Sequence, residues 1–300
     1  MKKEYVLITP AHNEEQFIEK TIKSVVMQTI LPKKWIIVDD ASSDATGEII
    51  KQYANQYDFI TYLRLTRQDK ATYYGHRTCV VLDGYKEIKK LDFDFLGALD
   101  ADITLLPAYY EGILQKFEQD PKLGIAAGVF FYEVNGHLKQ ALMDRLCTPG
   151  SHQVFRRECY EQIGGYIPLK YGGDDSLADI MARMYGWKTW SFDEYPAIQH
   201  RTVGTGGGRS ILYARFRQGL TDYGIATHPM FMLAKLLRRS VLEKPYFAGS
   251  LARLVGFLYG YWLREERLIP SEVIRFVRKE QLKRLLSRVP LFSNSVSPNI

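Results

Sequence analysis

Short apolar runs alternate with segments of helical spacing through the first hundred residues. Four runs have the length and composition of buried strands: Tyr5–Thr9, Trp35–Val38, Ile60–Leu65 and Phe95–Leu99. Three segments between them show helical periodicity: Glu14–Gln28, Thr46–Gln56 and Thr78–Lys89. Strands that alternate with amphipathic helices pair in parallel, and the helices cover both faces of the sheet. The pattern therefore predicts an α/β fold built from βαβ units.

The bulk composition is that of a folded protein. Three hundred residues with 46% hydrophobic content suffice for one large domain, or for a domain with a substantial appendage. The wide spacing of Cys79, Cys147 and Cys159 predicts reduced thiols in a cytosolic compartment rather than disulfides or a zinc site. The N-terminus leads into a strand rather than a signal-peptide core, and no apolar stretch is long enough for a clear membrane span.

Acidic residues follow two of the predicted strands, at the point where each strand ends. Asp39-Asp40 comes after the second strand, and Asp100-Ala101-Asp102 comes after the fourth. Ligands of parallel sheets collect at these carboxyl ends. Two carboxylates one residue apart can share a divalent cation, which in turn can hold a diphosphate. In the Asp39-Asp40 pair, one carboxylate can accept from a nucleobase N–H while the other caps the turn; capping by both is the alternative.

Three further segments carry polar groups suited to a ligand. Thr9–Glu14 joins a strand to a helix and can hold a base and ribose; an ordinary turn with Asn13 as helix cap is the alternative. Asp174-Asp175 follows a glycine turn at a helix start, which favours a positioned general base over a simple cap. His200 precedes the glycine-rich segment Thr202–Arg209, so it either contacts the metal or leaving phosphate, or is structural.

In combination these motifs resemble family 2 glycosyltransferases with the GT-A fold, from Tyr5 to about His200. The matching segments are Pro10-Ala11-x-Asn13-Glu14, Asp39-Asp40-x-Ser42-x-Asp44-x-Thr46, Asp100-Ala101-Asp102, Phe155-Arg156-Arg157 with Gly164-Gly165-Tyr166, and Asp174-Asp175. The resemblance implies a Rossmann-like, mostly parallel sheet flanked by helices. A nucleotide-sugar half would span about residues 1–103 and an acceptor half about 104–203. Residues 204–300 would form a glycine-rich loop and a basic, helical C-terminal extension.

The resemblance also implies an activity and roles for individual residues. The expected reaction is inverting transfer of a sugar from a UDP- or GDP-linked donor, helped by Mn²⁺ or Mg²⁺. The donor would contact Pro10, Ala11, His12, Glu14, Asp40, Asp100 and Ala101, with Asp40 at the base. Asp100 and Asp102 would serve the ribose and the metal, with His200 as a further metal ligand. Asp175 would be the catalytic base, next to Asp174.

The chain departs from the family pattern at three points. Asp174 stands where the family usually has Glu, a change that keeps Asp175 in the position of the base. The Gln-x-x-Arg-Trp signature of processive synthases is missing after His200, which favours transfer of single sugars. The usual Ala-x-Asn helix pattern is missing as well, so the expected basic contact to the diphosphate is either Lys70 or Arg77.

The C-terminal third is basic and rich in aromatic residues. Acids and bases nearly balance up to Tyr195, whereas bases dominate from His200 onward. Four helices are expected: Ile211–Tyr223, Pro229–Leu242, Tyr246–Leu263 and Glu272–Leu286. Four arginines are predicted at a lipid headgroup boundary: Arg238, Arg239, Arg253 and Arg264. The apolar side chains expected beside them there are Phe231, Leu236, Leu237, Phe257, Tyr261 and Trp262. Basic helices with an aromatic–apolar face are typical of membrane-surface attachment. Packing of these faces on the catalytic domain is the alternative.

The resemblance thus implies an enzyme that adds one sugar to an acceptor hydroxyl, on a lipid-linked glycan in bacterial polysaccharide biosynthesis. We expect it in the cytoplasm, peripheral on the inner face of the cell membrane, without a nucleic-acid partner. One alternative is a metal-dependent nucleotidyltransferase, which would need a glycine-rich phosphate loop that Pro10–Glu14 lacks. The other is a catalytically silent, membrane-docked scaffold, against which the intact acids argue.

Overall fold

The chain divides into two compact units. The computed structural model describes residues 4–66, 73–134, 137–201, 210–264 and 266–287. The first unit comprises Met1–Ala141 with Cys147–Gly208, and the second comprises Leu142–Leu146 with Arg209–Ile300. The predicted boundary at residues 203 and 204 lies outside the described residues. No sequence pattern predicts that Leu142–Leu146 belongs with the C-terminal helices.

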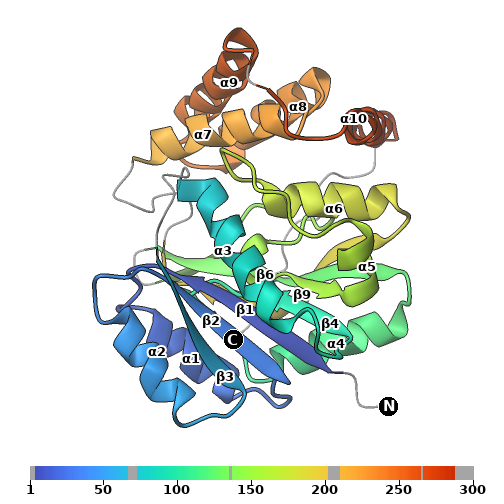
Figure 1. Cartoon of the computed structure of the whole chain (residues 1–300). Coiled ribbons are helices and arrows are strands. Elements are labelled where there is room, and N and C mark those ends of the chain that lie inside the picture. Colours follow the sequence, from blue (N-terminus) through green and yellow to red (C-terminus); the bar gives the residue numbers. More distant parts are fainter. Residues whose placement is uncertain (1–3, 67–72, 135–136, 202–209, 265, 288–300) are drawn as a thin grey trace. The chain divides into compact units, whose positions relative to one another are not determined.

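One sheet organises the first unit (Figure 1). Among the described residues it has nine strands, in the order β3-β2-β1-β4-β8-β6-β9-β5, with β7 paired to β6. The strands are β1 (Tyr5–Ala11), β2 (Lys34–Asp40), β3 (Ile60–Leu65), β4 (Phe95–Ala98), β5 (Ile103–Leu105), β6 (Leu123–Val134), β7 (His137–Gln140), β8 (Val154–Arg156) and β9 (Lys188–Gln199). The first four strands pair in parallel with one another, as predicted. The second half is mixed, because β8 pairs antiparallel with both β4 and β6.

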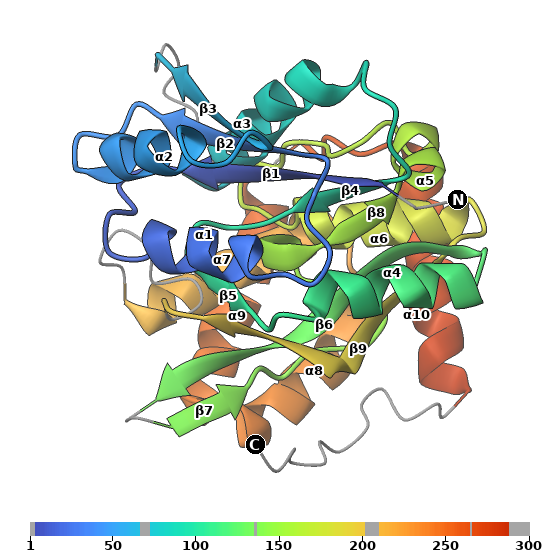
Figure 2. The ribbon, with the colours of Figure 1, turned by 90° about the horizontal axis from the view of Figure 1, so that it is seen from below.

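Helices cover both faces of this sheet. They are α1 (Ile18–Val26), α2 (Thr46–Ala54), α3 (Tyr73–Ile88), α4 (Tyr109–Gln119), α5 (Arg157–Gln162) and α6 (Asp174–Met184). Figures 1 and 2 show α1, α2 and α4 on one face and α3, α5 and α6 on the other. Side chains of a strand alternate between faces. Leu7 accordingly packs in the core with α1 and α4, whereas the next residue, Ile8, lies beside Gly84 of α3. The helix predicted from Glu14 begins only at Ile18.

The parallel strands bring the predicted acidic segments to one edge of the sheet. Ala11 at the end of β1 pairs in register with Asp39 of β2. On the other side of β1, Ile8 pairs with Ala98 at the end of β4, and Leu99 donates its N–H to the Ile8 carbonyl at 2.9 Å. The carboxyl ends of β1, β2 and β4 therefore open at the same edge.

The second unit contains the four predicted helices, each within two residues of its expected bounds. They are α7 (Ile211–Gly224), α8 (Pro229–Leu242), α9 (Tyr246–Trp262) and α10 (Ser271–Leu286). A small core of Tyr223, Met232, Leu236 and Phe257 joins α7, α8 and α9. Helices α7 and α9 approach closely, since a Cβ at Gly219 would lie 2.0 Å from the carbonyl oxygen of Arg253. Within the described ranges, no helix has both the length and the apolar character needed to cross a membrane.

The prediction that Arg253 lies at a headgroup boundary is wrong. Its side chain is buried, and its Nε donates to Asp222 Oδ2 at 2.8 Å. The close contact of α7 with α9 places this arginine inside the second unit. Leu236 and Phe257, predicted at the same boundary, are buried in the core. Helix α9 is apolar on more than one side, so its spacing alone does not distinguish the packed side from the exposed one.

Candidate active site

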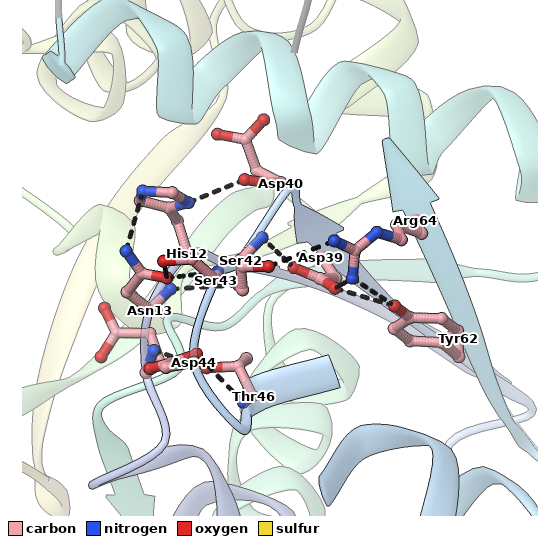
Figure 3. Close-up of polar contacts among 11 residues, drawn as sticks. His12, Asn13, Asp39, Asp40, Ser42, Ser43, Asp44, Thr46, Tyr62 and Arg64 are labelled. Carbon is pink, nitrogen blue, oxygen red and sulfur yellow. Dashed lines mark hydrogen bonds and ion pairs between the residues drawn. The ribbon is translucent and has the colours of Figure 1, made fainter. Parts of the chain in front are cut away.

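Asp39 is the capping member of the acidic pair at the end of β2. It is fully buried, and its Oδ1 accepts from the Ser42 N–H at 2.8 Å. Its Oδ2 accepts from the Tyr62 hydroxyl at 2.8 Å and from Arg64 Nη1 at 2.9 Å (Figure 3). Burial opposes ionisation, but these hydrogen bonds and the Arg64 charge outweigh it and hold the pKa of Asp39 below its ordinary value. Asp39 therefore fixes the turn after β2.

Asp40 has different surroundings. Figure 3 shows its carboxylate directed away from the Asp39 cluster, toward α3. There His76 Nε2 lies 2.8 Å from Asp40 Oδ2, at hydrogen-bond distance. The backbone oxygen of Asp40 lies 2.7 Å from His12 Nδ1. The structure thus separates the two carboxylates, one tied to the turn and the other directed toward α3.

The predicted segment Thr9–Glu14 is tied to the turn after β2 rather than to α1. Asn13 accepts through Oδ1 from the Ser43 N–H at 2.9 Å (Figure 3). Glu14 donates its N–H to Thr46 Oγ1 at 2.7 Å. The cap of α1 is Phe17, and it makes no side-chain cap bond. The expected alternative, Asn13 as the cap of the following helix, is therefore wrong. Asn13 instead has a left-handed φ of 54° and holds two loops of the sheet edge together.

A buried acidic group lies around the Asp-x-Asp motif. Arg201 forms a two-pronged ion pair with Glu14, with Nη–Oε distances of 3.0 and 2.6 Å. Burial raises the pKa of Glu14 to about 7; Arg201 lowers it, and the charges of Asp102 and Asp100 add to the rise. Burial and the neighbouring Asp100 also raise the pKa of Asp102 to about 6. Carboxylates that repel one another in a buried place are the setting in which an added cation is stabilising.

Arg77 joins the Asp-x-Asp motif to the acidic pair of α6. Its Nε donates to Asp100 Oδ1 at 2.8 Å, and its Nη2 donates to the carbonyl oxygen of Gly150 at 2.7 Å. Its Nη1 lies 3.4 Å from Asp174 Oδ2. Asp175 in turn accepts from the Gly150 N–H at 3.1 Å. Burial raises the pKa of Asp174 to about 6 against the lowering effect of Arg77.

His200 lies beside this group, next to the backbone of Asp102. Its N–H donates to the carbonyl oxygen of Asp102 at 3.0 Å. Its Nε2 lies 2.7 Å from Thr104 Oγ1, and its ring stacks on Phe17 with centroids 5.9 Å apart. In the described part of the chain, no three or more His, Cys, Asp or Glu side chains gather as a metal-binding group. A metal contact by His200 therefore stays a prediction.

Sequence reasoning found most of these residues and missed some of their partners. Pro10, Ala11 and Ala101 lie in the segments that form this edge, while Lys70 lies outside the described residues. His76 and Arg201 were missed as partners of Asp40 and Glu14. A signal did exist, because each is the immediate neighbour of a residue that was singled out, Arg77 or His200.

A comparison with models of protein families identifies the family of this chain. The model of the family described as "Glycosyl transferase family 2" matches residues 6–169. The chain belongs to glycosyltransferase family 2. It is 29% identical over 198 residues to the "Probable glycosyltransferase YdaM" of Bacillus subtilis (strain 168), a match that covers 57% of this chain and 44% of that protein. It is 28% identical over 204 residues to the poly-beta-1,6-N-acetyl-D-glucosamine synthase of Staphylococcus epidermidis, covering 61% and 44%. The chain thus matches less than half the length of these relatives.

Solved structures extend the likeness to nearly the whole chain. The mannosyltransferase PcManGT from Pyrobaculum calidifontis, in complex with GDP-Man and Mn²⁺, has a TM-score of 0.56 at 18% identity and covers 97% of this chain and 78% of its own. S. aureus TarS 1-349 in complex with UDP-GlcNAc has a TM-score of 0.55 at 15% identity, covering 96% and 82%. At these identities the likeness concerns the fold. It confirms the predicted GT-A architecture with C-terminal helices.

Proposed function

We propose that this protein transfers one sugar, with inversion, from a nucleotide-diphosphate sugar to a hydroxyl group of an acceptor. The observation that carries the proposal is the meeting of Asp100, Asp174 and Asp175 around Arg77, in a family 2 chain. Carboxylates for the donor and a carboxylate for the base are the two requirements of such a transfer. Similar folds solved with GDP-Man or UDP-GlcNAc support a nucleotide-sugar donor.

In this proposal Asp40 accepts a hydrogen bond from the nucleobase. Asp39 is committed to the turn, which leaves Asp40 as the member of the pair suited to a ligand. His76 and His12 contact Asp40 from two sides and would fix its orientation. Pro10, Ala11 and Glu14 would border the nucleotide at the same edge.

The donor set fits a divalent cation, Mn²⁺ or Mg²⁺, held by Asp100 and Asp102. These are hard oxygen ligands, and the raised pKa of buried Asp102 reflects a negative charge that such a cation would relieve. When bound, the cation would supply charge stabilisation to the departing diphosphate. His200 could join through its Nε2 only if that nitrogen gave up the hydroxyl of Thr104. Structures of similar fold that contain Mn²⁺ support this choice.

Asp175 acts as the general base. It lies in the first turn of α6, where the helix N-terminus favours an ionised carboxylate. The acceptor oxygen attacks the anomeric carbon and loses its proton to Asp175, while the bond from that carbon to the diphosphate oxygen breaks. Attack from the side opposite the diphosphate inverts the anomeric configuration.

The second unit is proposed to attach the enzyme to an anionic membrane surface, where a lipid-linked acceptor would be found. Residues 209–300 contain sixteen Lys and Arg against six Asp and Glu. Helices α8 and α9 each expose one row of large apolar side chains: Met230, Leu233, Leu237 and Val241, and Phe247, Leu251, Val255, Leu258 and Trp262. Apolar rows beside excess positive charge suit a lipid headgroup boundary. In this proposal the enzyme is cytoplasmic and peripheral on the inner face of the cell membrane.

A donor screen tests the enzymatic proposal. The full chain is incubated with UDP- and GDP-sugars and Mn²⁺, and both thermal stabilisation and released nucleotide are measured. We expect one donor to stabilise the protein and to release a nucleoside diphosphate when an acceptor is added. Release of pyrophosphate from a nucleoside triphosphate would instead indicate a nucleotidyltransferase. Binding without turnover over a broad set of acceptors would favour the silent scaffold.

A further inference from the structure

Three carboxylates of the candidate site, those of Asp100, Asp174 and Asp175, come from two separate parts of the chain, and Arg77 contacts two of them directly. Asp100 follows β4, and Asp174 and Asp175 begin α6. Arg77, on α3, binds Asp100 Oδ1 through both Nε, at 2.8 Å, and Nη2, at 2.7 Å. Its Nη1 lies 3.4 Å from Asp174 Oδ2. One guanidinium therefore holds together the two carboxylates that flank the proposed reaction.

The third carboxylate, that of Asp175, is reached through the short turn Gly150–His152. Arg77 Nη2 donates to the Gly150 carbonyl oxygen at 2.7 Å, and the Gly150 N–H donates to Asp175 Oδ2 at 3.1 Å. The neighbouring Ser151 carbonyl accepts from the N–H of Asp100 at 2.7 Å. A Cβ at Gly150 would lie only 2.9 Å from the Cβ of Asp175, so glycine permits this close approach. The turn thus links the backbone of Asp100 to the carboxylate of Asp175.

These contacts use all three nitrogens of Arg77. A guanidinium has five N–H donors in a fixed planar arrangement, which suits several acceptors held at set positions. Asp100 takes two contacts, and Gly150 and Asp174 take one each. A diphosphate oxygen would have to displace one of these partners. The arrangement favours a role in holding the site over a role in binding the donor.

We propose that Arg77 is a positioning residue that sets the distance between Asp100, on the donor side, and Asp175, the proposed base. The proposal rests on the proposed function, since it assigns the base to Asp175. It replaces the expectation that Arg77 contacts the diphosphate. Because both contacts of Arg77 to Asp100 are to Oδ1, the carboxylate keeps its other oxygen for the ribose or the metal.

The test compares Arg77→Lys and Arg77→Gln with the full-length wild type. Donor affinity is measured by calorimetry with the nucleoside diphosphate and Mn²⁺, and kcat is measured at saturating donor. A displacement of about 1 Å in a catalytic group costs on the order of 100-fold in rate. We expect both variants to lose about that factor in kcat, while the Kd of the nucleoside diphosphate stays within about threefold of wild type. Lysine keeps the charge but cannot span the three acceptors, so it should not rescue kcat.

A diphosphate contact gives the opposite pattern and would overturn the proposal. Arg77→Gln would then weaken nucleoside-diphosphate binding by about tenfold or more, and Arg77→Lys would restore much of it, because a point charge suffices for a phosphate. Arg183→Gln is the matched control. Arg183 is another partly buried arginine of the first unit, and its Nη1 binds the Thr189 hydroxyl at 2.9 Å. We expect this change to lower stability without the selective loss of kcat.

A double change keeps the test decisive if loss of Arg77 also lowers stability. Arg77→Gln is combined with Asp174→Asn, which removes the carboxylate left without its partner. If Arg77 acts by holding these carboxylates, the two changes are non-additive in kcat. Additive losses, or a wild-type kcat in Arg77→Lys, would refute the positioning role. Absence of any donor turnover by wild type would instead refute the proposed function, so the two failures are distinguishable.

Discussion

The two units of this chain treat apolar surface in opposite ways. Among the described residues, the first unit exposes seven large hydrophobic side chains, whereas the second exposes eighteen over less than half the length. The first unit buries its apolar residues between helices and a sheet, whereas the core cluster formed by the described residues of the second unit has four members, Tyr223, Met232, Leu236 and Phe257. A soluble surface rarely carries so many large apolar groups without a partner. This difference is why we propose a partner surface for the second unit and not for the first.

Buried charge differs between the units as well. In the first unit, acids outnumber the bases around them at the candidate site, and the pKa values of Asp102 and Glu14 are raised by burial. In the second, Asp222 lies between Arg253 Nε at 2.8 Å and Lys235 Nζ at 2.7 Å. Burial opposes ionisation of Asp222, but the two cations outweigh it and lower its pKa to about 2. The first unit thus has negative charge that a cationic ligand could neutralise. In the second unit, the buried acid Asp222 is already neutralised by basic side chains of the same unit.

Removal of divalent cations is expected to have the largest effect on activity, and it tests the difference in buried charge between the two units. If Asp100 and Asp102 hold a divalent cation, excess chelator should abolish sugar transfer, and Mn²⁺ or Mg²⁺ should restore it. Asp102→Asn should lose most activity while the fold survives. Vesicle binding by the second unit should be unchanged in both experiments. Full turnover in excess chelator would contradict the metal-dependent mechanism.

The proposed base should show the next largest effect. Asp175→Asn keeps the size of the side chain but cannot accept a proton, so transfer should fall by roughly 10²- to 10⁴-fold while donor binding persists. Asp174→Asn should be milder, because Asp174 touches Arg77 and not the acceptor in our proposal. Steady-state rates and calorimetric donor affinity check both variants. Small and equal losses would mean that the base lies elsewhere.

Loss of Asp222 tests the charge network of the second unit. Asp222→Asn leaves Arg253 and Lys235 without their buried counter-ion, which should cost about 3 kcal/mol or more of stability. Denaturant unfolding measures this loss. Donor binding by the first unit should be unaffected. Glu272→Gln is a matched control at an exposed acid, and its expected effect is within about 0.5 kcal/mol. A similar loss of stability in both variants would contradict a particular role for the buried ion pairs of Asp222.

A pH experiment separates the units further. Burial lowers the pKa of His152, in the first unit, to about 4. Its neutral form is therefore favoured by folding, and the stability that it contributes is present above about pH 6.5 and lost as the pH falls toward 4. Carboxyls such as Asp179, whose pKa burial raises to about 8, act in the opposite direction. The difference between wild type and His152→Gln isolates the histidine. We expect this difference in unfolding free energy to shrink, by on the order of 3 kcal/mol, between pH 6.5 and 4. Asp222 should not add to acid sensitivity until the pH falls below about 4.

The sequence allowed most of the elements with a strong apolar pattern to be predicted. The four parallel strands and the four C-terminal helices were predicted to within a few residues of their bounds. Each strand is a short apolar run, and each helix repeats its apolar residues at helical spacing over several turns. Strand β5 was missed because three residues are too few for a pattern. Helix α4 carries an apolar period but was not identified; its core side includes Tyr109, Tyr110, Ile113 and Phe117.

The candidate site could be predicted at the level of motifs and not of contacts. Asp-x-Asp and the pair at α6 mark strand ends and a helix start, which local sequence can indicate. Which member of Asp39-Asp40 caps the turn depends on Tyr62 and Arg64 of the neighbouring strand. The partners of Arg77 lie 23, 73 and 97 residues away along the chain. Such contacts depend on how α3 crosses the sheet, which no local pattern encodes.

The membrane proposal predicts the smallest effect for each single substitution. It tests most directly why the second unit exposes more apolar side chains than the first. Lys244 and Arg264 are exposed and lie just before and just after α9, whose outer row includes Phe247, Leu251 and Trp262. Each base near an anionic surface is worth about 1 kcal/mol and is screened by salt. Cosedimentation with anionic phosphatidylglycerol vesicles should therefore fall as salt rises, and about fivefold for each of Lys244→Gln and Arg264→Gln. Lys244→Arg keeps the charge and is the control.

Leu251→Ser should weaken vesicle binding equally at low and high salt, because the contribution of Leu251 is apolar. If the intact protein ignores anionic vesicles at low salt and instead dimerises with rising concentration, the exposed rows belong to a second copy of the chain, and the membrane proposal is wrong.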